Sequence, residues 1–114
     1  MPFLELKTNK QLSTDKKNQL MEDMTALLAK DLNKPQRVIM ISCMDNQDLM
    51  FGGSRDPLAF MELRSISLPE DQTGQLAQSL SSFVKNNLDI PEDRTFINFR
   101  NFDPHMWGYN GSTF

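Results

Sequence analysis

The 114-residue chain has few of the residues from which disulfides and metal sites are built. Its single cysteine, Cys43, excludes an internal disulfide and a cysteine zinc cage. Its single histidine, His105, leaves no histidine metal site, and a Ser–His–Asp unit would depend on this one residue. We therefore expect no metal and no cofactor, with Cys43 buried as a small apolar side chain and His105 exposed in a loop.

Long apolar runs and an excess of positive charge are also missing. No stretch approaches the roughly eighteen consecutive apolar residues of a membrane span, and no charged segment followed by an apolar one suggests a secretory signal. The formal net charge of −3 argues against a nucleic-acid or acidic-membrane binder, which would carry a basic face. These features predict a cytoplasmic protein with neither nucleic acid nor membrane as a partner.

Apolar spacing and capping residues divide the chain into strands and helices. Ser13 or Thr14 is expected to cap the first helix, and Asn33 followed by Pro35 is expected to end it. The glycine pair in "FGGS" and the Asn-Gly of "YNGS" predict tight turns. The predicted elements are a strand at 3–8, a helix ending near 32, strands at 37–44 and 57–66, a helix through 76–88, a strand at 95–101 and a small terminal strand pair.

This order, β-α-β-β-α-β, predicts an α+β fold in one domain spanning residues 1–114. The segments "PFLELKT" and "PLAFMELRS" open similar halves and suggest two β-α-β repeats. Each repeat implies a parallel strand pair with a right-handed crossover, which places both helices on one face of a four-stranded sheet. Because strand 37–44 is too apolar to face water, we expect the other face to be covered by further subunits of a homo-oligomer.

Pro2 is the first candidate for chemistry, and two interpretations are open. It either simply starts the chain or supplies a free secondary amine after removal of Met1, which cytosolic processing normally achieves when a small residue follows. Burial and a nearby cation would lower the pKa of that amine below the roughly 7.7–8.0 of an ordinary α-amino group, giving a general base. Lys34, in "NKP", is a candidate for that cation, or else a solvated lysine that complements the helix dipole.

A set of short motifs runs along the whole chain. They are "MP" before an apolar strand, "KP" after the first helix, "DLMFGGSRDP", "LRSI", "PEDRTFINF" and "NGSTF". Together they resemble the macrophage migration inhibitory factor family of the tautomerase superfamily. The resemblance implies a β-α-β-β-α-β subunit, a homotrimer whose sheets wrap into a central barrel-like core, and an isomerase activity on phenylpyruvate-like or dopachrome-like substrates.

The resemblance also implies a site, residue by residue. It places the catalytic base on Pro2, the substrate-binding lysine on Lys34 and a backbone contact on Ile66. A neighbouring subunit would complete the pocket with Phe96 and Asn98. Pro2 would move a proton between carbon and oxygen of an enol or keto acid, Lys34 and the Ile66 amide would hold its oxygens, and Asn98 would orient the aromatic ring or its hydroxyl.

Several positions depart from the family's pattern. Phe96 stands where the animal proteins usually have tyrosine, which favours phenylpyruvate over hydroxyphenylpyruvate. Trp107 replaces a smaller aliphatic residue at the pocket rim and would narrow the substrate pocket. The stretch "PLAF", which contains Leu58 and Phe60, stands where the family carries a cysteine-x-x-cysteine motif, so the oxidoreductase activity associated with that motif is not expected.

Functions of different classes remain open from the residues. One is the tautomerase based on Pro2, and another is a cytokine-like signalling or binding trimer whose pocket is weak or vestigial. These two predict the same fold. A hydratase-like or dehalogenase-like activity would need additional charged residues in the pocket, for which Arg37, Arg64 and Arg100 are available, although solvated structural roles suit these arginines better.

Overall fold

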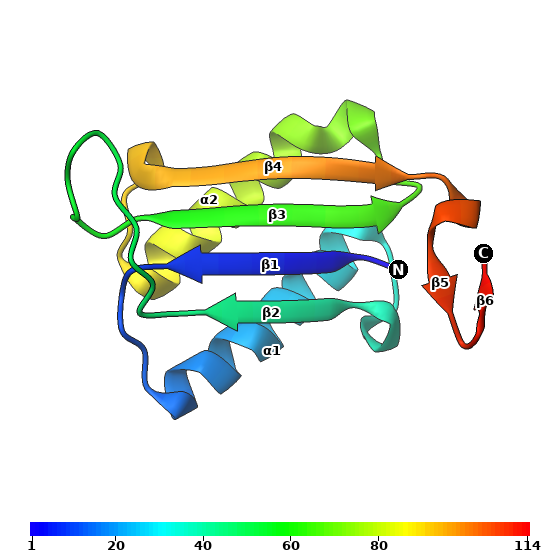
Figure 1. Cartoon of the computed structure of the whole chain (residues 1–114), viewed down its shortest axis with the longest axis horizontal. Coiled ribbons are helices and arrows are strands. Elements are labelled where there is room, and N and C mark those ends of the chain that lie inside the picture. Colours follow the sequence, from blue (N-terminus) through cyan, green and yellow to red (C-terminus); the bar gives the residue numbers. More distant parts are fainter.

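The computed structural model describes residues 1–114 and contains a four-stranded sheet with two helices on one side (Figure 1). The strand order is β2-β1-β3-β4, with β1 parallel to β2, antiparallel to β3, and β3 parallel to β4. This arrangement confirms the predicted β-α-β-β-α-β fold. The elements are β1 (Phe3–Thr8), α1 (Thr14–Leu32), β2 (Met40–Met44), β3 (Ala59–Ile66), α2 (Thr73–Leu88), β4 (Thr95–Phe102), β5 (Gly108–Tyr109) and β6 (Ser112–Thr113).

Helix α1 begins and ends where its capping residues predict. The Ser13 hydroxyl accepts a hydrogen bond from the Lys16 N–H at 3.1 Å, so the serine is the N-cap. Asn33 ends the helix in the left-handed conformation with φ 53°, which asparagine tolerates. The Lys34 N–H then donates to the Ala29 carbonyl at 3.0 Å. The backbone of Lys34 is therefore anchored to the end of α1.

Strand β2 is shorter than the predicted strand at 37–44. It starts at Met40 because Gln36–Val38 form a 3-10 turn, which brings the chain from the end of α1 back to the level of the sheet (Figure 1). An apolar run indicates burial but does not distinguish a strand from such a turn. The strands predicted at 57–66 and 95–101 shift by at most two residues at either end, to β3 and β4.

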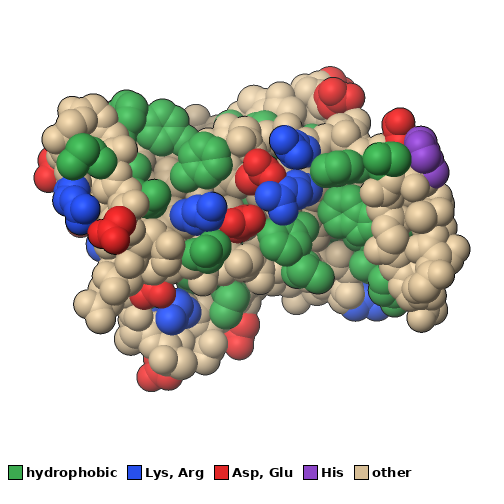
Figure 2. Space-filling model, in the orientation of Figure 1, with side chains coloured by type: hydrophobic (Ala, Val, Ile, Leu, Met, Phe, Trp, Pro, Cys, Tyr) green, Lys and Arg blue, Asp and Glu red, His purple; other side chains and the backbone are tan.

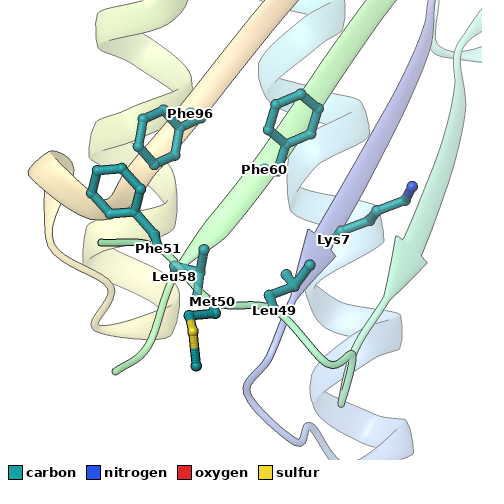
Figure 3. Close-up of a pocket in the computed structure, with 7 residues that line it drawn as sticks. All are labelled: Lys7, Leu49, Met50, Phe51, Leu58, Phe60 and Phe96. Atoms are coloured by element: carbon teal, nitrogen blue, oxygen red, sulfur yellow. The ribbon is translucent and has the colours of Figure 1, made fainter. Parts of the chain in front are cut away.

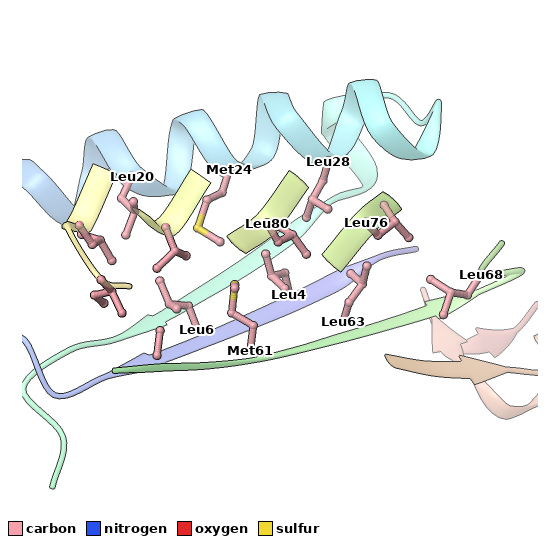
Figure 4. Close-up of a cluster of buried hydrophobic side chains, with 14 residues drawn as sticks. Leu4, Leu6, Leu20, Met24, Leu28, Met61, Leu63, Leu68, Leu76 and Leu80 are labelled. Carbon is pink, nitrogen blue, oxygen red and sulfur yellow. The ribbon is translucent and has the colours of Figure 1, made fainter. Parts of the chain in front are cut away.

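A single cluster of buried side chains fills the space between the sheet and the helices (Figure 4). Alternate residues of β1 and β3 face this cluster, as the pleat of a strand requires. No helix combines membrane-spanning length with sufficient apolar character. The fourteen members of the cluster are Leu4, Leu6, Leu20, Met24, Leu28, Ala59, Met61, Leu63, Leu68, Leu76, Leu80, Val84, Leu88 and Ile90.

Cys43 packs against this core but is only half-buried, so the prediction of a buried thiol is only partly correct. The reason is that β2 is an edge strand of the sheet. Burial raises the pKa of the Cys43 thiol, and the charge of Asp45 adds to this effect while that of Lys17 opposes it. The thiol is thereby held in its protonated, unreactive form. His105 is exposed in a 3-10 turn, as predicted.

The sheet face that the helices leave uncovered is called here the open face. Figure 2 shows charged side chains across its middle and apolar side chains toward both ends. Strand alternation places on it Phe3, Glu5 and Lys7 of β1, Met40, Ser42 and Met44 of β2, Phe60, Glu62 and Arg64 of β3, and Phe96, Asn98 and Arg100 of β4.

Ion pairs join the charged residues in the middle of the open face. The Glu5 carboxylate lies 3.5 Å from the Lys7 ammonium and 3.6 Å from the Arg64 guanidinium, which also donates to Glu62. Burial disfavours ionisation of Glu62, but the Arg64 hydrogen bond and the charges of Arg64 and Arg100 outweigh it and lower the pKa of Glu62. The open face is therefore less apolar than the sequence predicts. Its most exposed large apolar side chains are Met40, Met44, Phe60 and Phe96.

Candidate functional site

The chain start lies beside the carboxyl end of β3. Phe3 pairs with Arg64, so the antiparallel register continues with the first two residues next to Ile66. Figure 1 shows the amino terminus at the arrowhead of β3. Pro2 is fully buried, and its carbonyl accepts a hydrogen bond from the Met40 N–H at 3.0 Å. The position of Pro2 is thus fixed by strands on both sides.

Lys34 acts on the chain start through its charge. Burial lowers the pKa of the Met1 α-amino group from its ordinary value, and the positive charge of Lys34 lowers it further. Both effects disfavour the ammonium form of an amine. This end of the sheet therefore favours the neutral, basic form of the terminal nitrogen.

A polar hollow of about 490 Å³ opens beside Lys34. Its walls come from the end of α1 and from the segment that follows β3. Hydroxyl and amide side chains around a lysine ammonium are groups that bind a carboxylate. The residues around the hollow are Asp31, Leu32, Asn33, Lys34, Ser65, Ser67, Pro69 and Gln72.

Trp107 lies at the same end of the sheet. Phe102, the last residue of β4, pairs with Ile66. The Trp107 ring packs edge-on against the Phe102 ring, with centroids 5.5 Å apart and an interplanar angle of 79°. The Phe114 N–H donates to the Trp107 carbonyl at 3.2 Å, which holds the C-terminal residue close to Trp107. Four of the six predicted site residues thus gather at one end of the sheet.

The other two, Phe96 and Asn98, lie away from that end. Phe96 pairs with Phe60, six positions before the pair formed by Ile66 and Phe102. At about 3.3 Å per strand residue, this separation is about 20 Å. One chain therefore does not bring Phe96 to the chain start, and a site that uses both needs a second copy of the chain.

Phe96 lines a different cavity, of about 410 Å³ (Figure 3). Its walls are almost entirely apolar, and its one charged residue, Lys7, pairs with Glu5. This lining suits the cavity to binding an apolar group. The residues around it are Lys7, Leu49, Met50, Phe51, Leu58, Phe60 and Phe96.

Phe51 is a residue of this cavity that the sequence did not single out. Its ring packs edge-on against Phe96, with centroids 4.7 Å apart and an interplanar angle of 67°. The predicted "FGGS" turn is confirmed, because Phe51 and Ser54 exchange backbone hydrogen bonds of 3.0 Å around two glycines with positive φ. An aromatic residue at the start of a glycine turn was the only local signal for Phe51.

Known proteins resemble the chain along its whole length. The family model for macrophage migration inhibitory factor matches residues 1–114. The protein of that name from Xenopus tropicalis is 38% identical over 96 residues, which cover 83% of this chain and 84% of that protein. The solved structure of the homologue from Prochlorococcus marinus has a TM-score of 0.91 at 29% identity and covers 98% of both chains. The structure of the Trichinella spiralis protein has a TM-score of 0.90 at 31% identity, with 98% of this chain and 99% of that chain covered.

No group of three or more histidine, cysteine, aspartate or glutamate side chains lies close enough together to hold a metal ion. The features that the site does offer are a buried chain start, a lysine beside it and a set of aromatic residues. With the full-length family match and the likeness to solved homologues, they lead to one conclusion. The chain belongs to the macrophage migration inhibitory factor family, within the tautomerase superfamily.

Proposed function

We propose that this protein is an enol–keto tautomerase whose general base is the nitrogen of Pro2, freed by removal of Met1. The observation that carries the proposal is the buried position of Pro2 at the chain start, where burial and the charge of Lys34 lower the pKa of the Met1 amine. While Met1 is attached, the Pro2 nitrogen is part of an amide and is not basic. After removal it becomes the terminal amine, and we expect burial and Lys34 to bring its pKa below the roughly 7.7–8.0 of an ordinary α-amino group.

The proposed substrate is a phenylpyruvate-like or dopachrome-like compound. The Lys34 ammonium and the polar hollow beside it bind the carboxylate, and the Ile66 backbone N–H binds the carbonyl or enol oxygen. The neutral Pro2 nitrogen takes the proton of the enol hydroxyl and returns it to the adjacent carbon, so that the keto acid leaves with the base regenerated. No electrons are transferred, and the reaction needs no cofactor.

A homotrimer is part of this mechanism. At about 3.3 Å per strand residue, Phe96 lies about 20 Å and Asn98 about 13 Å from the Ile66 end of the sheet in one chain, so a neighbouring subunit supplies them. In a closed ring every subunit makes the same contact with its neighbour, so each site combines Pro2 and Lys34 of one subunit with Phe96 and Asn98 of the next. In the assembled pocket Phe96 stacks on the substrate ring, Asn98 orients the ring or its hydroxyl, and Trp107 narrows the entrance.

The test is the substitution Pro2→Gly, made after an intact mass has verified that Met1 is absent. We expect kcat/KM for phenylpyruvate tautomerisation to fall by at least about 100-fold, the usual contribution of a general base. Pro91→Ala is the matched control, because Pro91 is exposed and precedes β4 at the opposite end of the sheet. An unchanged rate in Pro2→Gly would refute the proline base and leave a binding or signalling trimer.

A further inference from the structure

We infer that Arg94 and Phe51 are positioning residues that fix the Phe96 ring and thereby set the affinity of the site for aromatic substrates. The inference rests on the proposed function, in which Phe96 stacks on the ring of the substrate. Neither Arg94 nor Phe51 touches the substrate in this scheme. Each acts through Phe96.

Arg94 ties the loop between β2 and β3 to the start of β4. Its Nε donates to the Pro57 carbonyl at 3.1 Å, and its Nη1 donates to the Phe51 carbonyl at 3.3 Å. Its Nη2 donates to the Ser54 and Asp56 carbonyls at 3.1 and 3.0 Å. Four of the five N–H donors of the guanidinium are thus used on one short loop. A lysine ammonium lacks the planar arrangement of N–H donors that a guanidinium has, so it does not reproduce these four hydrogen bonds.

The same guanidinium also contacts the first of two adjacent aromatic rings. Its central carbon lies 5.4 Å from the centroid of the Phe51 ring, within the range of a cation–π contact. The Phe51 ring in turn packs edge-on against Phe96 at 4.7 Å. Figure 3 shows the Phe51 and Phe96 rings next to each other at one side of the apolar cavity. Arg94, Phe51 and Phe96 therefore form a continuous row.

Phe96 needs such support because its ring lies at the flank of the open face and is 37% exposed. Phe51 provides the only ring-to-ring contact to Phe96 in the chain. A ring that is already held in place loses less conformational freedom when a substrate stacks on it. Stacking is present in both the ground state and the transition state, so this support is expected to lower KM and to leave kcat unchanged.

The experiment uses the full-length protein without Met1 and compares Arg94→Lys with Phe51→Leu. Each is expected to raise KM for phenylpyruvate by about three- to tenfold, the range of one aromatic contact, with kcat unchanged. Arg55→Lys is the matched control. Arg55 belongs to the same loop, but its guanidinium is exposed and pairs with Asp48 at 3.2 Å. Its replacement is expected to leave KM unchanged.

A mutant cycle separates positioning from simple stabilisation of the loop. In a Phe96→Leu background, Phe51→Leu is expected to cause no further change in KM, because the residue through which it acts is gone. A KM increase that persists in that background would overturn the inference. So would a lower unfolding temperature in Arg94→Lys with no change in KM, since that result describes a structural role alone.

A second readout does not depend on catalysis. The ring NMR signals of Phe96, assigned by their loss in Phe96→Leu, are expected to move in Arg94→Lys and Phe51→Leu and to stay in place in Arg55→Lys. If the unmodified protein shows no tautomerase activity, the proposed function fails while these signals still test the positioning. Unmoved Phe96 signals would overturn the inference whatever the activity.

Discussion

The two ends of the sheet differ in what they can do. The end with the chain start holds the buried Pro2, a partly buried Met1 amine whose pKa is lowered by burial and by Lys34, and a polar hollow. The opposite end holds Phe51 and Phe96 around an apolar cavity. One end is suited to proton transfer and the other to recognition of a ring. In the proposed mechanism, one folded chain contains both halves of the site without joining them.

The core between the helices and the sheet explains why the ends stay apart. Register along β3 and β4 fixes the separation of Phe96 from Ile66, and side chains such as Leu63 that are fully buried hold that register. A one-residue slip would turn these side chains out of the core, so the strands do not slide to bring the ends together. In the proposed site, the two halves therefore meet between neighbouring chains.

The largest predicted effect comes from mixing two inactive variants. Pro2→Gly removes the base, and Phe96→Asp places a negative charge where the other half of the pocket receives an anionic substrate. When the two chains assemble together in equal amounts, about a quarter of the sites combine an intact Pro2 with an intact Phe96. We expect about a quarter of the unmodified activity from the mixture, in a phenylpyruvate assay.

Each variant assembled alone serves as the control. Pro2→Gly is expected to keep at most a few per cent of the activity, on the usual scale of a lost general base, and Phe96→Asp is expected to lose activity because its charge repels the anionic substrate. Native mass spectrometry establishes that mixed trimers form. Mixed trimers with no more activity than the two separate variants would contradict a site shared between neighbouring chains.

A smaller effect is predicted for Lys34→Gln, which alters only the end with the chain start. The rate should rise with pH as the terminal amine loses its proton, with a midpoint below the roughly 7.7–8.0 of an ordinary amine. Removing the nearby positive charge favours the ammonium form and raises the pKa of the amine, so the midpoint should move to higher pH. We also expect KM to rise about tenfold, because a charged hydrogen bond to the carboxylate is lost.

Lys34→Arg and Lys30→Gln are the controls for that substitution. The first keeps the cation, and the second removes an exposed charge from the last turn of α1. Both should retain a midpoint close to that of the unmodified protein. A midpoint that stays in place in Lys34→Gln would show that Lys34 does not set the pKa of the base.

The smallest effect concerns backbone strain at residues with positive φ. At the end of the sheet near Phe51 and Phe96, the residues with positive φ include Gly52 and Gly53, with φ of 61° and 75°. At the end with the chain start, Ser67 has φ 54°. A serine in this region is strained, so Ser67→Gly should raise the free energy of unfolding by about 1 kcal/mol. Urea unfolding measures the change. Ser65→Gly, at a buried strand position nearby, should instead lower stability, and a loss in both variants would contradict strain at Ser67.

The sequence predicted the features of the fold that depend on neighbouring residues. The N-cap at Ser13 and the left-handed end at Asn33 are set by hydrogen bonds within one helical turn. The "FGGS" and Asn-Gly turns follow from glycines that adopt positive φ. Two β-α-β repeats with short connections leave few alternatives for the order of the strands.

The features that the sequence did not reveal depend on distant residues. Arg94 binds carbonyls about forty positions earlier in the chain, and no local pattern marks such a contact. The half-burial of Cys43 follows from the edge position of β2, which is a property of the whole sheet. The ion pairs around Glu5 and Arg64 depend on the register between β1 and β3.

The most direct measurement is a pH titration of the Pro2 nitrogen by NMR, on protein labelled with ¹⁵N-proline and lacking Met1. We predict a midpoint below the roughly 7.7–8.0 of an ordinary α-amino group. A midpoint within or above that range, as an exposed terminal amine would show, would contradict the role of the Pro2 nitrogen as the base.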